Sequence, residues 1–152
     1  MKYLFILGRN VELSVAEINS YLEREGTKVK SRKIIDNALL VEIDKELNKD
    51  LVKLLGGTIS IGEVLAEGEE KKITRELDCK TLYMGTKNNI TYLIYDFSNK
   101  ENYGFIIQYL KKRFKEERLK ASEKNLNGIL KLQDGKEVRI SKGLIDEEFF
   151  IF

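Results

Sequence analysis

The sequence predicts an α+β protein with two domains, residues 1–66 and 67–152. Apolar runs of strand length alternate with stretches in which apolar residues recur at helical spacing. A chain of 152 residues, 42% of them hydrophobic and 34% charged, is long enough for two small globular domains. A charged segment at residues 66–72 has the composition of a connection between them.

The first two predicted elements are a strand and a helix. Residues 3–8 are a nearly continuous apolar run, which is typical of a buried central strand. Ser14 and Glu17 have the spacing of a capping box, so we expect a helix to begin at Ser14. Gly26 is placed to end this helix in the left-handed conformation that glycine adopts easily.

Residues 28–43 predict a β-hairpin. The first strand, 28–35, is heavily basic, as expected of an edge strand that must not pair with other chains. Asp36 and Asn37 both tolerate positive φ, and they therefore favour a tight turn. The second strand, 38–43, is mostly apolar.

A second helix and a fourth strand complete the first half. Leucines at helical spacing predict a helix within residues 47–55, which Gly56 and Gly57 would end. Residues 58–65 then return as a strand. The resulting order, βαββαβ, is that of a ferredoxin-like domain, in which right-handed crossovers place both helices on one face of an antiparallel sheet.

The second half has a less regular pattern. Residues 73–85 are ambiguous, with a short helix as one interpretation. Residues 90–97 predict a strand because tyrosine and β-branched residues dominate this run. A capping-box spacing at Ser98–Glu101, followed by an apolar stripe, predicts a helix that reaches about Glu117.

Four further elements are expected after that helix. We expect a short strand at 118–121 and a short helix at 125–132. Two strands at 136–141 and 147–152 follow, with a turn at Lys142–Gly143 between them. The last four residues are apolar, which indicates either a docked terminal strand or a chain that belongs to a larger architecture.

The composition excludes several kinds of function. The chain has no histidine, so Ser-His and Cys-His nucleophile pairs and His-bearing zinc sites are excluded. Cys79 is the one cysteine, and it fits a reducing compartment because it has no intramolecular disulfide partner. The N-terminal apolar run is too short for a secretion signal or a membrane span. We expect a cytoplasmic protein without a metal, a membrane segment or a cofactor of its own.

Positive charge concentrates in residues 108–124, although the whole chain has 27 basic and 25 acidic residues. Seven basic residues stand against three acidic ones in this segment. On a helix, Lys111, Lys115 and Arg118 would form one basic ridge that can bind successive phosphates, with affinity that falls as salt rises. The alternative is a solvated helix face whose cations favour the C-terminal end of the helix dipole.

Two other functions remain open at this stage. Gly8–Arg9–Asn10 lies between a strand and a helix N-terminus, where an anion can bind free N–H groups. On a ferredoxin-like domain this position suggests an acylphosphatase-like enzyme, although no glycine-rich phosphate loop accompanies it. A non-enzymatic ferredoxin-like module for protein interaction or small-ligand binding is the other alternative.

Residues 3–18 read Tyr-Leu-Phe-Ile-Leu-Gly-Arg-Asn-Val-Glu-Leu-Ser-Val-Ala-Glu-Ile. This segment resembles the start of the THUMP-containing tRNA guanine-N2 methyltransferases, where a strand ending in Leu-Gly precedes Glu-Leu-Ser-x-Ala-Glu-Ile. Residues 92–97 and 110–116, with the basic segment that follows, are similar to that family's THUMP domain. The resemblance implies a ferredoxin-like domain and a THUMP domain that binds tRNA for a catalytic domain using S-adenosylmethionine.

The resemblance also assigns residues to RNA binding. Lys111, Lys112 and Lys115 match the family's Lys-Lys-x-x-Lys helix, and position alone adds Arg118, Lys120 and Lys124. A chain without proline cannot contain the family's Asp/Asn-Pro-Pro-aromatic catalytic motif. We therefore expect the RNA-holding region of an RNA methyltransferase, with S-adenosylmethionine bound only by a catalytic domain outside this chain.

Overall fold

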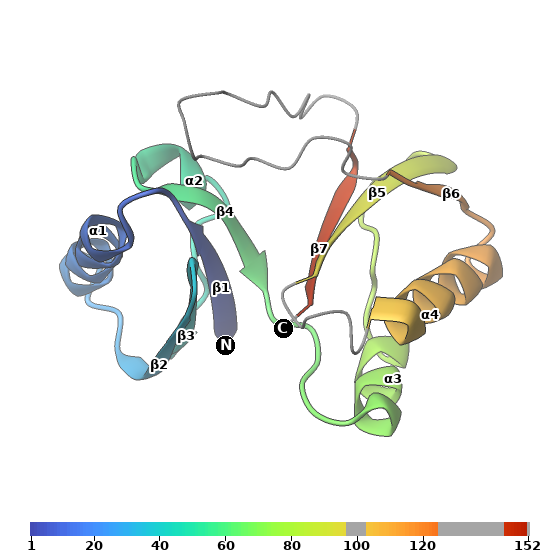
Figure 1. The fold of residues 1–152 in the computed structure, drawn as a ribbon, viewed down its shortest axis with the longest axis horizontal. Coiled ribbons are helices and arrows are strands. Elements are labelled where there is room, and N and C mark those ends of the chain that lie inside the picture. The colour runs from blue at the N-terminus through green and yellow to red at the C-terminus, as the bar shows by residue number, and fades with distance from the viewer. Residues whose placement is uncertain (97–102, 125–144, 152) are drawn as a thin grey trace. The chain divides into compact units, whose positions relative to one another are not determined.

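A computed structural model describes residues 1–96, 103–124 and 145–151 of the chain. The chain divides into two compact units, Met1–Leu65 (unit 1) and Ala66–Phe152 (unit 2) (Figure 1). An antiparallel sheet with helices forms unit 1, and a parallel sheet with helices forms unit 2, which confirms the α+β class. No helix within the described residues has the length and apolar character needed to cross a membrane.

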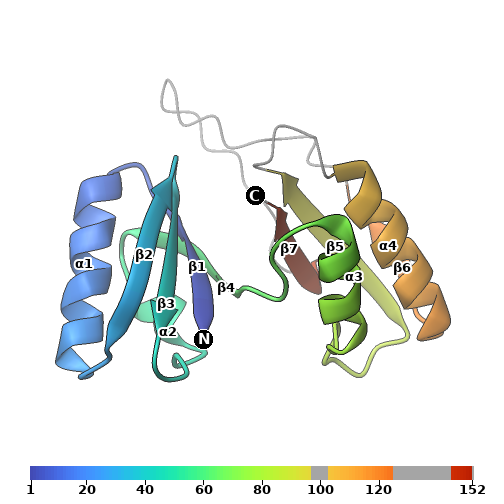
Figure 2. The same ribbon diagram turned by 90° about the horizontal axis from the view of Figure 1, so that it is seen from below.

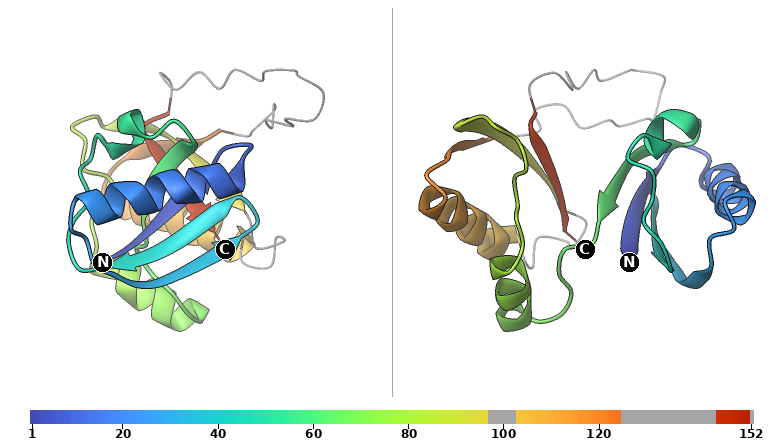
Figure 3. Two further views of the ribbon diagram at one scale, coloured as in Figure 1. Left: turned by 90° about the vertical axis from the view of Figure 1, so that its left-hand side faces the viewer. Right: turned by 180° about the vertical axis from the view of Figure 1, so that it is seen from behind.

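Unit 1 is built on a four-stranded antiparallel sheet. Its strands are β1 (Lys2–Leu7), β2 (Val29–Ile35), β3 (Ala38–Ile43) and β4 (Thr58–Glu63). Their order in the sheet is β2-β3-β1-β4, so the strand predicted to be central pairs with β3 on one side and β4 on the other. Helix α1 (Val11–Arg24) lies across one face of this sheet (Figure 3).

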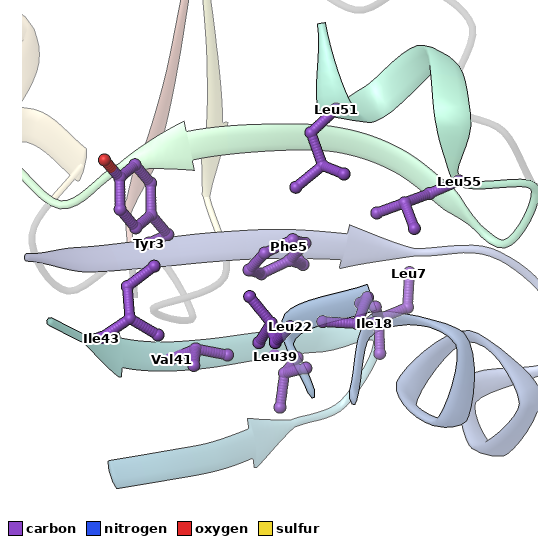
Figure 4. Close-up of a cluster of buried hydrophobic side chains, with 10 residues drawn as sticks. All are labelled: Tyr3, Phe5, Leu7, Ile18, Leu22, Leu39, Val41, Ile43, Leu51 and Leu55. Atoms are coloured by element: carbon purple, nitrogen blue, oxygen red, sulfur yellow. The ribbon is translucent and has the colours of Figure 1, made fainter. Parts of the chain in front are cut away.

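The core of unit 1 lies between the sheet and its helices. Phe5 is fully buried near the middle of the cluster (Figure 4). Ile18 and Leu22 reach it from α1, because they lie one helical turn apart on the same face. Burial of each such side chain stabilises the fold by about 1.5–3 kcal/mol. The remaining buried members are Tyr3, Leu7, Leu39, Val41, Ile43, Leu51 and Leu55.

Helix α1 begins three residues earlier than the sequence predicts. Asn10 is its N-cap, and the Asn10 side-chain oxygen accepts the backbone N–H of Leu13 at 3.1 Å. Ser14 lies inside the helix, where its hydroxyl is 2.8 Å from the carbonyl oxygen of Asn10. The expected capping box is therefore wrong. An asparagine caps a helix as well as a serine does, and Asn10 is the nearer candidate to the strand.

Ser14 and Glu17 instead connect α1 to the loop before β4. The two carboxylate oxygens of Glu17 accept the N–H groups of Gly56 and Gly57, each at 2.8 Å. The Ser14 hydroxyl also lies 2.7 Å from the Gly57 carbonyl oxygen. A Cβ at position 57 would stand 2.5 Å from the Ser14 hydroxyl oxygen, so this approach requires glycine. We call these four residues the α1 latch.

The remaining elements of unit 1 agree closely with the predicted ones. The β2–β3 hairpin turns at Asp36, which has the expected positive φ of 49°, and Ile35 pairs directly with Ala38. Gly26 has a φ of 60° after α1, as expected of a left-handed helix end. Helix α2 (Leu51–Leu54) is a single turn, which is shorter than the leucine spacing predicts.

Unit 2 is built on a three-stranded parallel sheet. In the order β6-β5-β7, its strands are β6 (Lys120–Glu123), β5 (Asn89–Asp96) and β7 (Glu147–Ile151). Helix α4 (Tyr103–Glu116) packs on one face, and α3 (Glu70–Asp78) lies beside it (Figure 2). Parallel neighbours need a crossover, which α4 provides between β5 and β6.

The structure corrects two boundaries in unit 2. Helix α3 begins at Glu70, so the last three residues of the predicted 66–72 connection are helical. The ambiguous run at 73–85 contains the rest of α3. The strand expected at 118–121 begins two residues later, because Arg118 has a φ of 59° that no strand allows.

Several predicted features of unit 2 lie outside the described residues. They are the capping box at Ser98–Glu101, the helix at 125–132, the strand at 136–141 and the turn at Lys142–Gly143. The predicted strand at 147–152 corresponds to β7 over its described part.

Aromatic rings form the contact between α4 and its sheet. The centroids of the Tyr92 and Phe114 rings are 5.3 Å apart, and both side chains are fully buried. Phe149 of β7 meets each of these two rings at 6.2 Å. The Tyr109 hydroxyl of α4 donates to Asp78 of α3 at 2.8 Å, so the two helices are tied together.

Candidate nucleic-acid interface

The predicted basic residues surround the C-terminal end of α4 and the edge strand β6. Helix α4 ends at Glu116, so Lys111 and Lys115 lie one turn apart on it while Arg118 lies in the turn beyond it. The basic ridge is therefore not continuous along one helix. All six predicted RNA-binding side chains are exposed: Lys111, Lys112, Lys115, Arg118, Lys120 and Lys124.

Two of these six residues, both lysines, have carboxylate partners. The Lys111 amine lies 3.5 Å from Glu123, whose side chain is only 15% exposed. The Lys112 amine lies 3.8 Å from Glu116, one helical turn away. Exposed pairs of this kind contribute about 0–1 kcal/mol to stability, but they do cancel local charge. These two lysines are thus the weaker candidates for binding an anion.

Glu117, the third acidic residue of the segment, pairs with an arginine that has a structural role. Arg113 of α4, which is only 24% exposed, pairs at 2.9 Å with Glu117, the residue after the helix. Its guanidinium also donates to the Lys80 carbonyl oxygen at 3.5 Å. Arg113 therefore holds the end of α4 against the segment that follows α3.

Four cations of this surface have no carboxylate within 4.0 Å among the described residues. They carry the whole excess of positive charge in residues 108–124, since the three acidic residues are paired elsewhere. We call this set the α4–β6 cation cluster: Lys115, Arg118, Lys120 and Lys124. Their location shifts the candidate interface from the helix ridge to the turn and strand after it.

Arg118 occupies a backbone position that favours glycine. The N–H of Arg118 donates to the Lys115 carbonyl oxygen at 3.1 Å, and the N–H of Leu119 donates to the Phe114 carbonyl oxygen at 2.9 Å. This bonding closes α4 in a Schellman motif with Arg118 at the left-handed position. The left-handed conformation costs a residue with a Cβ about 1–2 kcal/mol. The motif turns the chain so that Arg118 follows the helix end directly.

The chain shows no match to a protein-family model, to a curated protein or to a solved structure.

The structure gives little support to the other candidate sites of the sequence, which are the anion site at Gly8–Asn10 and the single cysteine. Arg9 is exposed, and Asn10 beside it already satisfies two N–H groups at the start of α1. Glu12 adds a negative charge to that helical turn, which disfavours an anion there. Cys79 is exposed at the end of α3. No cluster of three or more acidic or cysteine side chains that could hold a metal is present in the described part of the chain.

The pairing of charges was only partly readable from the sequence. Lys112–Glu116 and Arg113–Glu117 have the four-residue spacing that brings side chains together on a helix. The Lys111–Glu123 pair joins a helix to a strand, so it required the tertiary structure. The residues that sequence reasoning missed are Tyr95 and Phe150, whose rings stack across β5 and β7 with centroids 4.8 Å apart.

Proposed function

We propose that unit 2 binds RNA through the α4–β6 cation cluster, and that the chain holds tRNA for an S-adenosylmethionine-dependent methyltransferase domain. One observation carries the RNA-binding part of this proposal. Four exposed cations on a single helix–turn–strand segment have no carboxylate partner among the described residues. Phosphate oxygens are the ligands that such a surface recruits, since each contact releases condensed counterions from the RNA.

The arrangement of unit 1 supports the family to which the sequence points. Its element order βαββαβ and its strand order β2-β3-β1-β4 are those of a ferredoxin-like domain. We propose that unit 2 is the THUMP-like domain and that the boundary between the domains is at residue 66. The methyltransferase itself is proposed only from the resemblance of residues 3–18.

The location of the cations favours binding to the nucleic-acid backbone rather than reading of bases. Lysine ammonium groups bind phosphate as point charges, while base edges require fixed bidentate donors. Lys115, Lys120 and Lys124 are exposed on flexible stems and have no hydrogen-bonded neighbours that fix their direction among the described residues. The expected affinity is therefore sensitive to salt and tolerant of sequence.

A test compares tRNA binding by the full chain and by a triple variant, Lys115→Gln, Lys120→Gln and Lys124→Gln, across a range of salt concentrations. Three lost phosphate contacts lower the slope of log affinity against log salt by about 2–3. The matched control is Lys28→Gln, Lys30→Gln and Lys33→Gln, which removes the same charge from the exposed β2 edge.

Each outcome of this comparison is decisive. A lower slope in the α4–β6 variant, with the β2 variant close to the wild type, supports the proposal. Equal losses in the two variants would show that only net charge matters, and would remove the assignment to unit 2. An absence of salt-dependent binding, together with stable self-association, would favour a protein-interaction module instead.

A further inference from the structure

The parallel sheet of unit 2 has two faces with different chemistry. In a strand, alternate side chains point to opposite faces, and paired residues of parallel neighbours share a face. Tyr92 and its partners Glu123 and Glu147 therefore face α4, as the Tyr92–Phe114 contact shows. Tyr95 and its partner Phe150 lie on the opposite face.

Tyr95 and Phe150 form a parallel aromatic pair on that opposite face. Their ring centroids are 4.8 Å apart with an interplanar angle of 6°. Leu93, two residues earlier on the same face, is buried to 1% exposure, whereas both rings remain partly exposed. Accessible aromatic surface on this face is thus found at the carboxyl ends of β5 and β7.

The hydroxyl group of Tyr95 lies near a carboxylate of β7. Burial of the ring and the nearby Glu148 carboxylate, which accepts the hydroxyl, raise the pKa of Tyr95 to about 12. The phenol is therefore neutral at physiological pH, and its ring is oriented by the parallel ring of Phe150. A ring that is already oriented loses little conformational entropy when a flat ligand stacks on it.

Among the described strands of unit 2, lysines lie on the β6 side of this aromatic pair. Lys120 pairs with Asn89 at the start of β5, so it lies on the same face as Tyr95. Lys124 follows the last residue of β6 and lies level with the end of the Tyr92–Leu93 segment, since the Lys124 N–H donates to the Tyr92 carbonyl oxygen at 2.9 Å. From Asn89 to Tyr95 the strand runs about 20 Å. The β7 side carries Glu148, which repels phosphate.

We propose that Tyr95 and Phe150 form a stacking platform for an unpaired nucleobase, and that Lys124 and Lys120 bind the phosphates of the strand that leads to it. This inference rests on the proposed RNA binding and adds that the ligand is single-stranded at this face. Aromatic rings accept any base because every base has a π-face, while cations along the path track the backbone. In a base-paired duplex the faces of the bases are stacked on one another, so they cannot reach the platform.

The experiment uses the full chain and a single-stranded RNA oligonucleotide with one 2-aminopurine, whose emission is quenched when it stacks. The chain has no tryptophan, so the probe can be excited selectively. We expect quenching on binding. Tyr95→Leu and Phe150→Leu should each weaken binding of this oligonucleotide roughly 10-fold and reduce the quenching. The same two substitutions should change the affinity for a duplex of the same length by less than about twofold, because a duplex does not stack on the platform.

Two control variants separate stacking from folding. Tyr95→Phe keeps the ring but loses the hydroxyl contact with Glu148, so it should keep the quenching and lose less affinity than Tyr95→Leu. Phe105→Leu removes a partly exposed ring of α4 and should leave binding unchanged. If the leucine variants at 95 and 150 do not fold, the wild-type chain is the test: quenching on binding supports the platform, and binding without quenching overturns it.

The possible failures of the two proposals differ. Salt-dependent RNA binding without quenching, or with equal losses for single strands and duplexes, overturns the platform and leaves the proposed function standing. An absence of RNA binding under all salt conditions overturns the proposed function and the platform with it.

Discussion

Arg118 and Gly26 occupy the same position in two copies of one helix-ending motif. After α1, the N–H of Thr27 donates to the Leu22 carbonyl oxygen at 2.8 Å, as the N–H of Leu119 does to Phe114 after α4. The residue in the left-handed conformation is Gly26 in the first case and Arg118 in the second. Glycine adopts that conformation without a steric penalty, and arginine does not. An energetically unfavourable residue that carries an exposed charge indicates a role outside folding.

The first prediction separates stability from binding at Arg118. Arg118→Gly should raise the free energy of unfolding by up to about 1 kcal/mol, because it relieves the left-handed strain. The same change should weaken tRNA binding, since it removes one cation of the α4–β6 cluster. Urea denaturation and a binding titration measure the two effects. Arg118→Lys serves as the control that retains charge and strain, and a loss of affinity with Arg118→Lys would contradict the simple charge argument.

The reverse substitution at Gly26 measures the free-energy cost of the left-handed conformation for a residue with a Cβ. No atom lies within 4 Å of the position that a Gly26 Cβ would occupy, so a side chain there meets only backbone strain. Gly26→Arg should therefore lower the free energy of unfolding by about 1–2 kcal/mol, measured by urea denaturation. An unchanged stability would mean that the strain assigned to Arg118 is too large.

At the scale of the elements, contacts between them give Ser14 and Glu17 a role in folding. Both residues hold the loop before β4 through the α1 latch. In unit 2, Asp146 has the corresponding role, because its carboxylate accepts the Thr91 N–H at 2.8 Å and pairs with Lys87 next to β7.

The latch gives a prediction for Glu17. Glu17→Gln replaces a carboxylate that accepts two N–H groups with an amide that has one acceptor oxygen. One of the two loop N–H groups, exposed at Gly56 and partly buried at Gly57, then loses its charged partner. The free energy of unfolding should fall by about 1–3 kcal/mol, measured by urea denaturation. Glu23→Gln, on an exposed position of the same helix, should stay within about 0.5 kcal/mol of the wild type. Similar losses in both variants would show that helix charge, rather than the latch, is responsible.

Asp146 gives a prediction for pH dependence. The Lys87 amine, first, and the Thr91 N–H hold the pKa of Asp146 below its usual value of 3.8. A lowered pKa in the folded state contributes stability that is present above 3.8 and is lost as the pH falls through the folded value. Asp146→Asn should therefore lower the urea midpoint near neutral pH, and the difference from the wild type should shrink below pH 3.8.

The contribution of Lys87 to stability has the opposite dependence on pH. Asp146 raises the pKa of Lys87 above 10.5, so its contribution is present below that pH and is lost as the pH rises through the folded value. The pair therefore stabilises unit 2 between these limits. A difference between Asp146→Asn and the wild type that stays constant from neutral pH to pH 3 would contradict this account.

At the scale of the whole molecule, the two units differ in the kinds of side chain that they expose. Unit 1 contains the apolar cluster around Phe5 and the basic β2 edge. Unit 2 combines the α4–β6 cation cluster with the partly exposed aromatic pair. A charged edge strand discourages sheet extension, which accounts for β2 without an RNA partner.

This division predicts where RNA protects the backbone from hydrogen exchange. A ligand that binds only the folded state lowers the rate of local opening at its site. With tRNA present, amides of residues 115–124 should exchange more slowly, while those of β2 should not change. Mass spectrometry of peptides from the two regions measures this difference. Protection of β2 without protection of 115–124 would place the interface on unit 1.

Local patterns accounted for most of the elements and for few of their contacts. Apolar runs identified β1 and β3, and turn chemistry identified Asp36 and Gly26, because these signals depend on neighbours in sequence. The same signals misassigned Ser14, which fits a capping box locally but bonds to Gly57 across the unit. Local patterns also did not predict the partner of Lys111, since Glu123 lies on a separate strand.

The sequence alone determined the α+β class, the absence of histidine and proline chemistry, and the basic character of residues 108–124. The tertiary structure decided which of those cations have carboxylate partners and that Tyr95 stacks on Phe150. The physical reason is the separation in sequence between the residues that interact. Secondary structure and composition follow from local sterics and hydrophobic spacing, whereas charge pairing and ring stacking depend on strands that are distant in the chain and adjacent in the sheet.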